Sequence, residues 1–319
     1  LRARGPAVRA AEPPRSARGR VRSGPAMSDV DRPVLRYHGG KWRLAPWILG
    51  FFPPHRVYVE PFGGAASVLM RKARCYAEVY NDLDGEVVNV FRVLRDPVTA
   101  SQLDRLLRFT PFARREFVDA YKPCDDPVER ARRTIIKSFC GFGSAAIHGR
   151  SANVGMRTRA STWPTTGFRS NSNRSGTTPA HDWQRYPEEI GGFVTRLAGV
   201  VIEEREARDV MATHDGPDTL HYVDPPYVHA TRGRTHEYQH EMTDDEHRSL
   251  AAVLRAVRGM VVLSGYPCEL YDVDLYPDWE RHERKHLADG ARKRTEVVWL
   301  NAACVDALGR ARLQQEAFA

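Results

Sequence analysis

The chain has 319 residues, 42% of them apolar and 28% charged, which is enough for one large α/β domain with an insert. Its apolar runs, such as residues 260–263, fall far short of the ~20 residues that a membrane-spanning helix needs, which excludes a transmembrane role. The five cysteines are scattered and form no Cys-x-x-Cys pair. This pattern indicates neither a disulfide framework nor a structural metal, and it favours a reducing cytoplasm.

The positive charge is concentrated at the N-terminus. Residues 1–26 carry seven Arg against Glu12 alone, whereas the whole chain has a net charge of +8, so the remainder carries only +2. The segment is rich in Arg, Ala, Pro and Gly, shows no apolar periodicity and begins with Leu. We expect a disordered, non-native leader, with Met27 as the true start. A nucleic-acid-binding arm and a transit peptide are the alternatives, although the prolines would interrupt a transit helix.

Two β-turn-α units come next. Residues 57–59 form a short apolar run typical of a buried strand, and residues 64–72 predict a helix behind a glycine-bearing turn. Residues 77–80 predict a second strand, and Asp84 is placed to cap a helix whose apolar residues share one face. Two consecutive units of this kind predict a parallel sheet.

The chain then loses its strand patterns between residues 97 and 187. Helical patterns occupy residues 102–109, 112–121 and 128–139. A stretch rich in Gly, Ser, Asn and Thr follows them. Strand patterns return later, at residues 200–202, 219–223, 260–263 and 295–300. Thr243 and Glu246 form a capping box for a helix between two of these strands.

These patterns define the expected domain organisation. An α/β sheet core is divided by a mainly helical insert. We place the core at residues 27–97 and 198–310, the insert at 98–197 and a tail at 311–319.

The sharpest motif is Asp224-Pro225-Pro226-Tyr227, directly after the apolar run 220–223. Ligands of open α/β sheets bind at the carboxyl ends of strands, which gives this position weight. The prolines stiffen the backbone and leave a carboxylate, a bare carbonyl and an aromatic ring projecting together. These groups suit a planar ligand with an exocyclic amine, because they offer two acceptors for the amino hydrogens and a ring for stacking. A Pro-Pro loop with an incidental Asp is the alternative.

Small residues follow the first predicted strand, in the run Glu60-Pro61-Phe62-Gly63-Gly64-Ala65-Ala66-Ser67. Small side chains let a ligand approach the backbone at the start of a helix, although a tight structural turn is an equal alternative. The run is neither a dinucleotide fingerprint nor a P-loop. Asp82 ends the next strand about twenty residues on, where an acid can bind ribose hydroxyls. Together these features predict a nucleoside-bearing cofactor.

A third block, Tyr37-His38-Gly39-Gly40-Lys41, precedes an amphipathic stretch at residues 42–49. The helix dipole disfavours a lysine at the start of a helix unless the lysine serves an anionic ligand. A simple solvent-exposed lysine is the alternative.

These three blocks, in this order, resemble the Dam-type, or D12 class, adenine-specific DNA methyltransferases, which use S-adenosylmethionine. The sequence looks closest to phage and prophage members. The resemblance extends from about Leu35 to Asn301 and includes residues 166–171 of the insert and the run Arg292-Lys293-Arg294-Thr295-Glu296-Val297. It implies a Rossmann-like methyltransferase sheet of the seven-strand type with a helical target-recognition insert.

The resemblance also implies the roles of the site residues. Tyr37, Gly39 and Lys41 would hold the methionine end of the cofactor, with Lys41 on its carboxylate. Phe62 and Gly63 would line the cofactor pocket, and Asp82 would bind the ribose. Glu206 matches the acid that touches the cofactor adenine in the family, where Asp is commoner. The catalytic residues would be Asp224, Pro225, Pro226 and Tyr227.

The chemistry of the motif agrees with this assignment. The N6 amine of adenine is a poor nucleophile because its lone pair is delocalised, and acceptors at Asp224 and the Pro225 carbonyl would favour a more pyramidal nitrogen. Asp224 need not deprotonate the amine beforehand, because the methylated, cationic nitrogen loses a proton easily. The target atom is unreachable inside a duplex, so the base must be flipped out, with Tyr227 as its stacking platform.

The insert has a composition suited to double-stranded DNA. Between Arg130 and His181 there are nine Lys or Arg and no Asp or Glu, a balance typical of phosphate binding, although a solvated basic loop is the alternative. The expected DNA-binding residues are Arg36, Arg130, Arg133, Lys137, Arg169, Asn171 and Arg174. A second basic cluster lies at residues 281–285 and 292–294. We expect a monomer without an obligate protein partner.

Two other functions remain open at this point. An RNA or rRNA methyltransferase would use the same acceptor pair, and a DNA-binding relative could keep the fold without catalysis. Family members commonly methylate GATC, but a single sequence does not fix the recognition site, nor whether the protein belongs to a restriction pair. The histidines, including those at 236, 240, 247 and 282, show no metal spacing and are expected to be solvated loop residues.

Overall fold

The structure, a computed structural model, describes residues 28–141, 146–147, 167–170, 178–231, 240–288 and 292–317. The expected leader and most of the Gly, Ser, Asn and Thr stretch of the insert lie outside these residues. Within them, we find no helix that combines the length and the apolar character needed to span a membrane.

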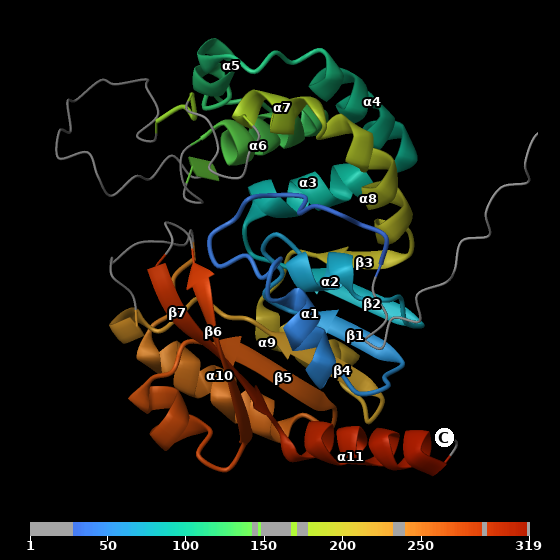
Figure 1. Ribbon diagram of the computed structural model, residues 1–319, viewed down its shortest axis with the longest axis vertical. Helices are drawn as coiled ribbons and strands as arrows, with labels where there is room; N and C mark the ends of the chain where they lie inside the picture. The colour runs from blue at the N-terminus through green and yellow to red at the C-terminus, as the bar shows by residue number, and fades with distance from the viewer. Residues whose placement is uncertain are drawn as a thin grey trace, which may run out of the picture.

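The described residues build one seven-stranded sheet in the order β3-β2-β1-β4-β5-β7-β6 (Figure 1). The strands are β1 (Val57–Glu60), β2 (Ala77–Asn81), β3 (Val200–Glu203), β4 (Thr219–Val223), β5 (Met260–Gly265), β6 (Glu280–Ala288) and β7 (Arg292–Leu300). Strands β1 to β5 are parallel, whereas β7 is antiparallel to both β5 and β6. This arrangement confirms the expected Rossmann-like α/β sheet.

Helices flank the sheet. They are α1 (Ala45–Ile48), α2 (Ser67–Arg71), α3 (Gly85–Arg95), α4 (Pro97–Arg108), α5 (Arg114–Asp119), α6 (Pro127–Cys140), α7 (Pro179–Gln184), α8 (Ile190–Leu197), α9 (Ala207–His214), α10 (Asp244–Ala256) and α11 (Ala302–Ala317). Shorter helical turns occupy Leu49–Phe51, Pro187–Glu189, His229–Thr231 and Leu270–Leu275. The predicted caps are present: Asp84 accepts hydrogen bonds from two backbone N–H groups of α3, and Thr243 and Glu246 form a complete capping box on α10.

Two elements differ from the sequence patterns. Helix α2 begins at Ser67 instead of residue 64, because Gly64 and Ala66 adopt left-handed φ angles of 47° and 51° and turn the chain sharply first. Strand β6 was not predicted, because its sequence is almost entirely polar and charged. It lies at the edge of the sheet and pairs with β7 alone, so it needs no continuous apolar face.

The central strands send alternate side chains into two apolar layers. Leu220 and Tyr222 of β4 join the layer packed by α1, α2 and α3, whereas Val223 joins the layer packed by α9 and α10. In β5, Val262 faces the first layer and Leu263 the second. This period-two alternation is what allows a parallel sheet to be covered by helices on both faces.

The insert helices share the first of these apolar layers. Leu103 of α4, Ile135 of α6 and Phe193 of α8 belong to the same buried cluster as Phe91 of α3. Helix α3 packs against β3 on one side and against α6 and α8 on the other (Figure 1). The insert is therefore fixed to the sheet by a continuous core.

A buried charge cluster joins α8 to the sheet. Glu78 of β2 accepts from Lys72 at 2.6 Å and from Arg196 of α8 at 2.6 Å, and Arg196 also donates to the Leu69 carbonyl. All three charged side chains are at most 4% exposed. Burial alone would raise the pKa of Glu78, but the two cations hold it below its usual range. The cluster fixes the seam between insert and sheet.

We expect Glu78→Gln to reduce the free energy of unfolding by ~3–5 kcal/mol, because it leaves two buried cations without an anionic partner. Urea denaturation measures this change. The control is Glu204→Gln, which breaks the exposed pair with Arg92 and should cost less than about 1 kcal/mol. Equal effects of the two substitutions would mean that the buried cluster does not secure the seam.

Candidate active site

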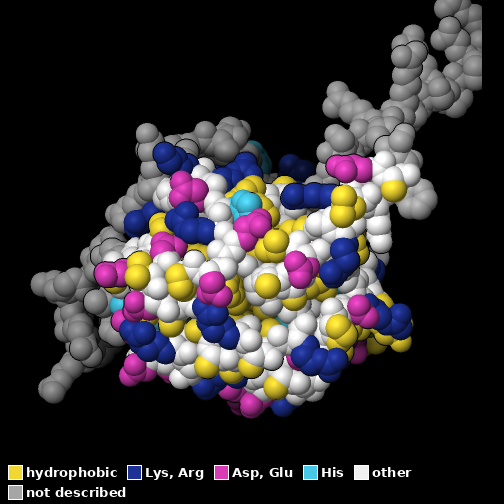
Figure 2. Space-filling model, turned by 90° about the horizontal axis from the view of Figure 1, so that it is seen from below, with side chains coloured by type: hydrophobic (Ala, Val, Ile, Leu, Met, Phe, Trp, Pro, Cys, Tyr) yellow, Lys and Arg dark blue, Asp and Glu magenta, His cyan; other side chains and the backbone are white. Residues whose placement is uncertain are grey.

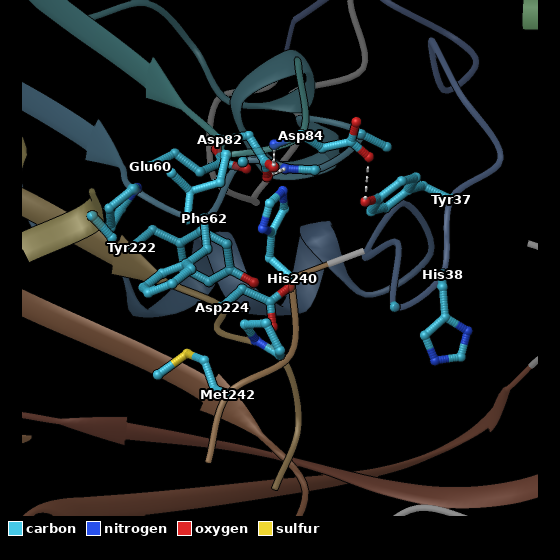
Figure 3. A pocket seen from close by; sticks show the side chains of 18 of the residues that line it. Tyr37, His38, Glu60, Phe62, Asp82, Asp84, Tyr222, Asp224, His240 and Met242 are labelled. Atoms are coloured by element: carbon cyan, nitrogen blue, oxygen red, sulfur yellow. Dashed lines mark hydrogen bonds between the residues drawn. The ribbon is translucent and has the colours of Figure 1, made fainter. Parts of the chain in front are cut away.

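A cavity of about 420 Å³ opens at the carboxyl ends of β1, β2 and β4 (Figure 3). The strand order reverses between β1 and β4, and ligands of open α/β sheets bind at this kind of reversal. Nine of the residues predicted from the sequence line the cavity: Tyr37, Gly39, Lys41, Phe62, Gly63, Asp82, Glu206, Asp224 and Pro226. The structure thus brings the three sequence blocks together, with Pro225 and Tyr227 beside the cavity in the same loop.

The glycine-bearing turn forms one wall. A Cβ atom built on Gly63 would lie 2.1 Å from the ring of Tyr80, so only glycine fits this position. Gly64 has a positive φ and donates its backbone N–H to Asp82 at 2.7 Å. The small residues thus bring backbone close to the cavity, as the sequence predicts.

Asp82 is held rigidly at the end of β2. Its two carboxylate oxygens accept backbone N–H groups of Gly64 and Asp84, at 2.7 and 2.8 Å. Burial raises the pKa of Asp82, and the two backbone hydrogen bonds oppose the rise. Each oxygen keeps a free lone pair for a ligand hydroxyl in the cavity.

Lys41 reaches the proposed catalytic loop. Its ammonium donates to Asp224 Oδ1 at 2.8 Å, to the Tyr227 hydroxyl at 2.5 Å and to the Gly39 carbonyl at 3.2 Å. The side chain is only 3% exposed, so the lysine is not the solvent-exposed residue of the alternative interpretation. The block at residues 37–41 thus fixes the loop that follows β4.

Asp224 is bound on two sides. Besides Lys41, the hydroxyl of Ser264 at the end of β5 donates to Asp224 Oδ1 at 2.9 Å. Burial raises the pKa of Asp224, Lys41 opposes the rise, and the charge of Glu296 on β7 adds to it. The carboxylate is therefore a fixed acceptor at the edge of the cavity.

Tyr227 stacks on a second aromatic ring. Its ring centroid lies 4.1 Å from that of Tyr266, with an interplanar angle of 23°. The Lys41 ammonium lies 4.7 Å from the Tyr227 ring centroid and 2.5 Å from its hydroxyl, so it contacts both the ring and the hydroxyl group. Tyr266 lies in no recognisable motif, so its position beside Tyr227 was not predicted.

Glu60 is a buried carboxyl group that the sequence analysis assigned no role. Its Oε2 accepts from the Tyr58 hydroxyl at 2.7 Å and from the Leu69 N–H at 3.0 Å. Burial raises the pKa of Glu60 to about 8, against a usual value of 4.5. The group is therefore mostly protonated at neutral pH, and it links β1 to α2 at the wall of the cavity.

The segment before α10 closes another side of the cavity. His240 and Met242 line it, and Figure 3 shows the imidazole of His240 pointing toward Asp82. A solvated loop histidine was predicted at this position, because no metal spacing surrounds it in the sequence. The Thr243 capping box was the available signal, since it places the residues just before it at the start of a helix.

Other histidines also differ from the expected solvated loop positions. His247 is fully buried in α10 and its Nδ1 bonds with the Tyr271 hydroxyl at 3.0 Å. His282 is on β6 and its ring lies 4.7 Å from that of Phe51. Among the residues that the structure describes, no three His, Cys, Asp or Glu side chains form a group able to hold a metal ion.

Four of the expected DNA-binding residues have acidic partners or are buried. Arg36 pairs with Asp182 of α7, Arg130 with Glu86 of α3 at 2.6 Å, and Arg133 with Glu129 of α6 at 2.7 Å. Burial lowers the pKa of Lys137. The acids that balance the basic stretch come from α3, the start of α6 and α7, so the charge count along the sequence did not reveal them.

Arg169 is half-buried, and burial lowers its pKa as well. Its backbone N–H donates to the Cys140 carbonyl at 2.8 Å, which attaches residues 167–170 to the end of α6. Asn171 and Arg174 lie outside the described residues.

The charge on one outer face is mixed. Figure 2 views the molecule from the end opposite the insert helices, and there basic and acidic side chains alternate without a large patch of either sign. Such a surface is typical of solvated protein and offers no concentrated positive field for a polyanion.

The fold and the cavity together indicate the class of protein to which the chain belongs. A mixed seven-stranded sheet with a ligand cavity at the β1/β4 reversal and an Asp-Pro-Pro-Tyr loop beside it is consistent with a Rossmann-like methyltransferase. The model of the D12 class N6 adenine-specific DNA methyltransferase family matches residues 37–123 and 166–289, which is more than half of the chain. The chain therefore belongs to this family. The comparison with curated proteins found no match.

We expect the pKa of Glu60 to make stability depend on pH. Its folded-state pKa of about 8 lies above the usual 4.5, so the folded protein binds the extra proton between these values. The free energy of unfolding should then fall as pH rises through this window, by up to ~1.4 kcal/mol per pH unit from this group. Denaturation of the wild type and Glu60→Gln across the range measures the effect. A pH slope that persists unchanged in Glu60→Gln would contradict it.

We expect Gly63→Ala to destabilise the protein by about 1–3 kcal/mol and to weaken cofactor binding, because its methyl group would displace Tyr80 and the adjoining wall. Thermal unfolding and calorimetric titration with S-adenosylmethionine measure the two effects. Gly50→Ala is the matched control, since its Cβ would meet nothing within 4 Å. Wild-type affinity in Gly63→Ala would show that this wall does not contact the cofactor.

Proposed function

We propose that the protein transfers the methyl group of S-adenosylmethionine to the N6 atom of an adenine that is flipped out of duplex DNA at a specific site. Membership of the family supports methylation of adenine in DNA. The observation that carries the finer proposal is the fixed Asp224 carboxylate, held by Lys41 and Ser264 at the edge of the cavity.

The charge of the cavity fits this cofactor. Its walls carry more acidic than basic groups, the acids being Glu60, Asp82, Asp84, Glu206, Asp224, Glu241 and Glu246 and the permanent cations Lys41 and Arg208. Such a wall opposes the phosphates of a dinucleotide and suits a ligand with hydroxyl groups and a positive charge. S-adenosylmethionine has no phosphate and supplies an electrophilic methyl group on a cationic sulfur.

Different lining residues would contact the ribose, the adenine and the methionine parts of this ligand. Asp82 would accept the ribose hydroxyls, because its remaining lone pairs face the cavity. Glu206, at the start of α9 and paired with Arg208, would lie at the adenine end. Phe62 and Gly63 would form the wall between them, and the loop of Tyr37 and Gly39 would hold the methionine end.

The contacts of Lys41 change its proposed role. An ammonium has three N–H groups, and those of Lys41 bond to Asp224, Tyr227 and the Gly39 carbonyl. A cofactor carboxylate could be bound only by giving up one of these bonds. We therefore propose that Lys41 chiefly orients the catalytic loop, and that binding of the cofactor carboxylate is secondary.

The acceptor geometry suits an amine nucleophile. Asp224 and the Pro225 carbonyl would accept the two N6 hydrogens and draw electron density toward the nitrogen. A fixed acceptor costs no reorganisation when the positive charge develops on N6. The carboxylate then takes the proton that the methylated nitrogen releases.

Tyr227 would stack on the flipped adenine. A ring inserted between Tyr227 and Tyr266 would need a centroid separation of about 7 Å, twice the contact distance of carbon atoms, whereas the observed separation is 4.1 Å. The adenine therefore requires the other face of Tyr227 or a displacement of Tyr266.

Duplex binding by the insert remains part of the proposal. Phosphates would have to compete with Asp182 for Arg36, with Glu86 for Arg130 and with Glu129 for Arg133. Exchange of a carboxylate partner for a phosphate is feasible because Arg36 and Arg130 are about one-third exposed. Arg169, Asn171 and Arg174 complete the proposed contact set.

The test is transfer of labelled methyl from S-adenosylmethionine to duplex DNA, with the products resolved as nucleosides. We expect labelled N6-methyladenine, and a loss of at least ~100-fold in Asp224→Asn, because the amide cannot accept from the amine in the same way. The control is Asp274→Asn, which changes an exposed aspartate of the turn Leu270–Leu275 that pairs with Arg248 of α10, and it should retain activity.

The alternatives give different outcomes in the same assay. Labelled methyl in RNA but not in DNA would favour an RNA methyltransferase. DNA binding by the wild type without transfer to either substrate would favour the inactive relative, and calorimetry with the cofactor would then show no binding.

A further inference from the structure

One carboxylate beside the site has no role in the function proposed above. Glu296 lies on β7, and because Gly265 pairs with Val297, it is positioned next to Tyr266 at the carboxyl end of β5. The antiparallel course of β7 brings the first half of this strand to the edge where Asp224 follows β4. The side chain of Glu296 is 1% exposed.

This carboxylate is buried without a hydrogen bond from any described residue. Its Oε1 lies 3.4 Å from the Lys41 ammonium, and its Oε2 lies 3.6 Å from His286 Nε2 on β6. Burial of an ionised carboxylate is costly unless a nearby charge compensates. The permanent cation in contact is Lys41, which already bonds to Asp224.

We propose that Glu296 is a positioning residue for the methyl transfer, and that it holds the Lys41 ammonium, and through it Asp224 and Tyr227, at the edge of the cavity. This inference rests on the function proposed above. A cation drawn by carboxylates on two strands stays between them, whereas a cation drawn by Asp224 alone could follow a ligand carboxylate into the cavity.

The electrostatics agree with this geometry. Asp224 and Glu296 lie on either side of the same cation. Because like charges repel, the negative charge of Glu296 disfavours ionisation of Asp224 and raises its pKa. Its removal leaves Asp224 with the full attraction of Lys41, and the pKa of Asp224 should fall.

Other groups face the two carboxylates from each neighbouring element. Glu60 of β1, Tyr222 of β4 and Ser264 of β5 face Asp224. Glu60 has a pKa of about 8 and is mostly neutral below it. His286 of β6, Arg284 of β6, which is the register partner of Glu296, and Tyr266 after β5 face Glu296. Of the two glutamates, Glu296 is the one whose charge bears on the Asp224 and Lys41 pair in the proposal.

The test compares single-turnover methyl transfer to duplex DNA by the wild type and Glu296→Gln, from about pH 5 to pH 9. Asp224 must be ionised to accept from the amine, so protonation of Asp224 sets the acid limb of the profile. We expect the limb to move to lower pH by ~1 unit in Glu296→Gln. The rate on the plateau should fall ~3–10-fold, because Lys41 is held less firmly.

Two further variants serve as a control and as a milder substitution. Glu283→Gln removes an exposed carboxylate from the same hairpin and should keep the wild-type profile. Glu296→Asp withdraws the charge by one methylene group and should move the acid limb in the same direction as Glu296→Gln, by less. If Glu296→Gln does not fold, the aspartate variant alone decides, and an unchanged limb overturns the proposal.

A second measurement needs neither DNA nor cofactor. Carbon-13 NMR of protein labelled at the aspartate carboxyl carbons follows the titration of Asp224, whose signal is assigned by its absence in Asp224→Asn. We expect the titration midpoint to fall in Glu296→Gln.

The two measurements separate two failures. If the wild type transfers no methyl group to DNA, the proposed function fails, while the NMR titration still tests the charge cluster. If the wild type is active and Glu296→Gln folds with an unchanged acid limb and an unchanged Asp224 midpoint, the role of Glu296 is overturned.

Discussion

The contact on which the site depends is a single buried ammonium. Lys41 comes from the loop before α1, yet its Nζ lies within 3.4 Å of groups that follow β4 and that belong to β7. Residues that are far apart in the sequence are thus fixed to one point. A buried cation retains its place only if anions surround it, so Asp224 and Glu296 stabilise Lys41 as much as Lys41 orients them. The geometry of the acceptor loop follows from this mutual dependence.

The insert is tied to the same sheet by apolar packing and by charge. Phe91 of α3 and Ile135 of α6 share one core with the sheet, and Arg196 of α8 reaches Glu78 of β2. Because this junction is packed and ion-paired, the insert presents its surface in a fixed relation to the cavity. Arginines of the insert form ion pairs with acidic residues of α3 and α6. In the proposed function, DNA would have to take the place of these acidic partners, so its binding would depend on shape as well as on charge.

Much of the fold could be predicted from the sequence, because apolar period and helix caps are local signals. The strands at 57–60 and 219–223 and the cap at Asp84 are of this kind, and so is the position of the Asp-Pro-Pro-Tyr loop after a buried strand. The polar edge strand β6 gave no such signal. Glu60 was missed because a sequence does not reveal how completely a strand-end carboxyl group is buried. Glu296 and Tyr266 were missed for another reason: their importance comes from neighbours that only the sheet order brings together. Sequence spacing does not reveal a pairing across an antiparallel ladder.

The carboxylates explain why an acid-rich cavity is compatible with a stable fold. Glu60 avoids a buried charge by keeping its proton, Asp82 is held by two backbone N–H groups, and Asp224 shares a cation with Glu296. Each acid is thus compensated by a different means, and the compensating groups belong to the fold instead of to a ligand. The acidic groups that line the cavity outnumber the basic ones, which favours a cation over a phosphate there. The methyl donor of the proposed function carries a positively charged sulfur and no phosphate, so it would match the charge of these walls.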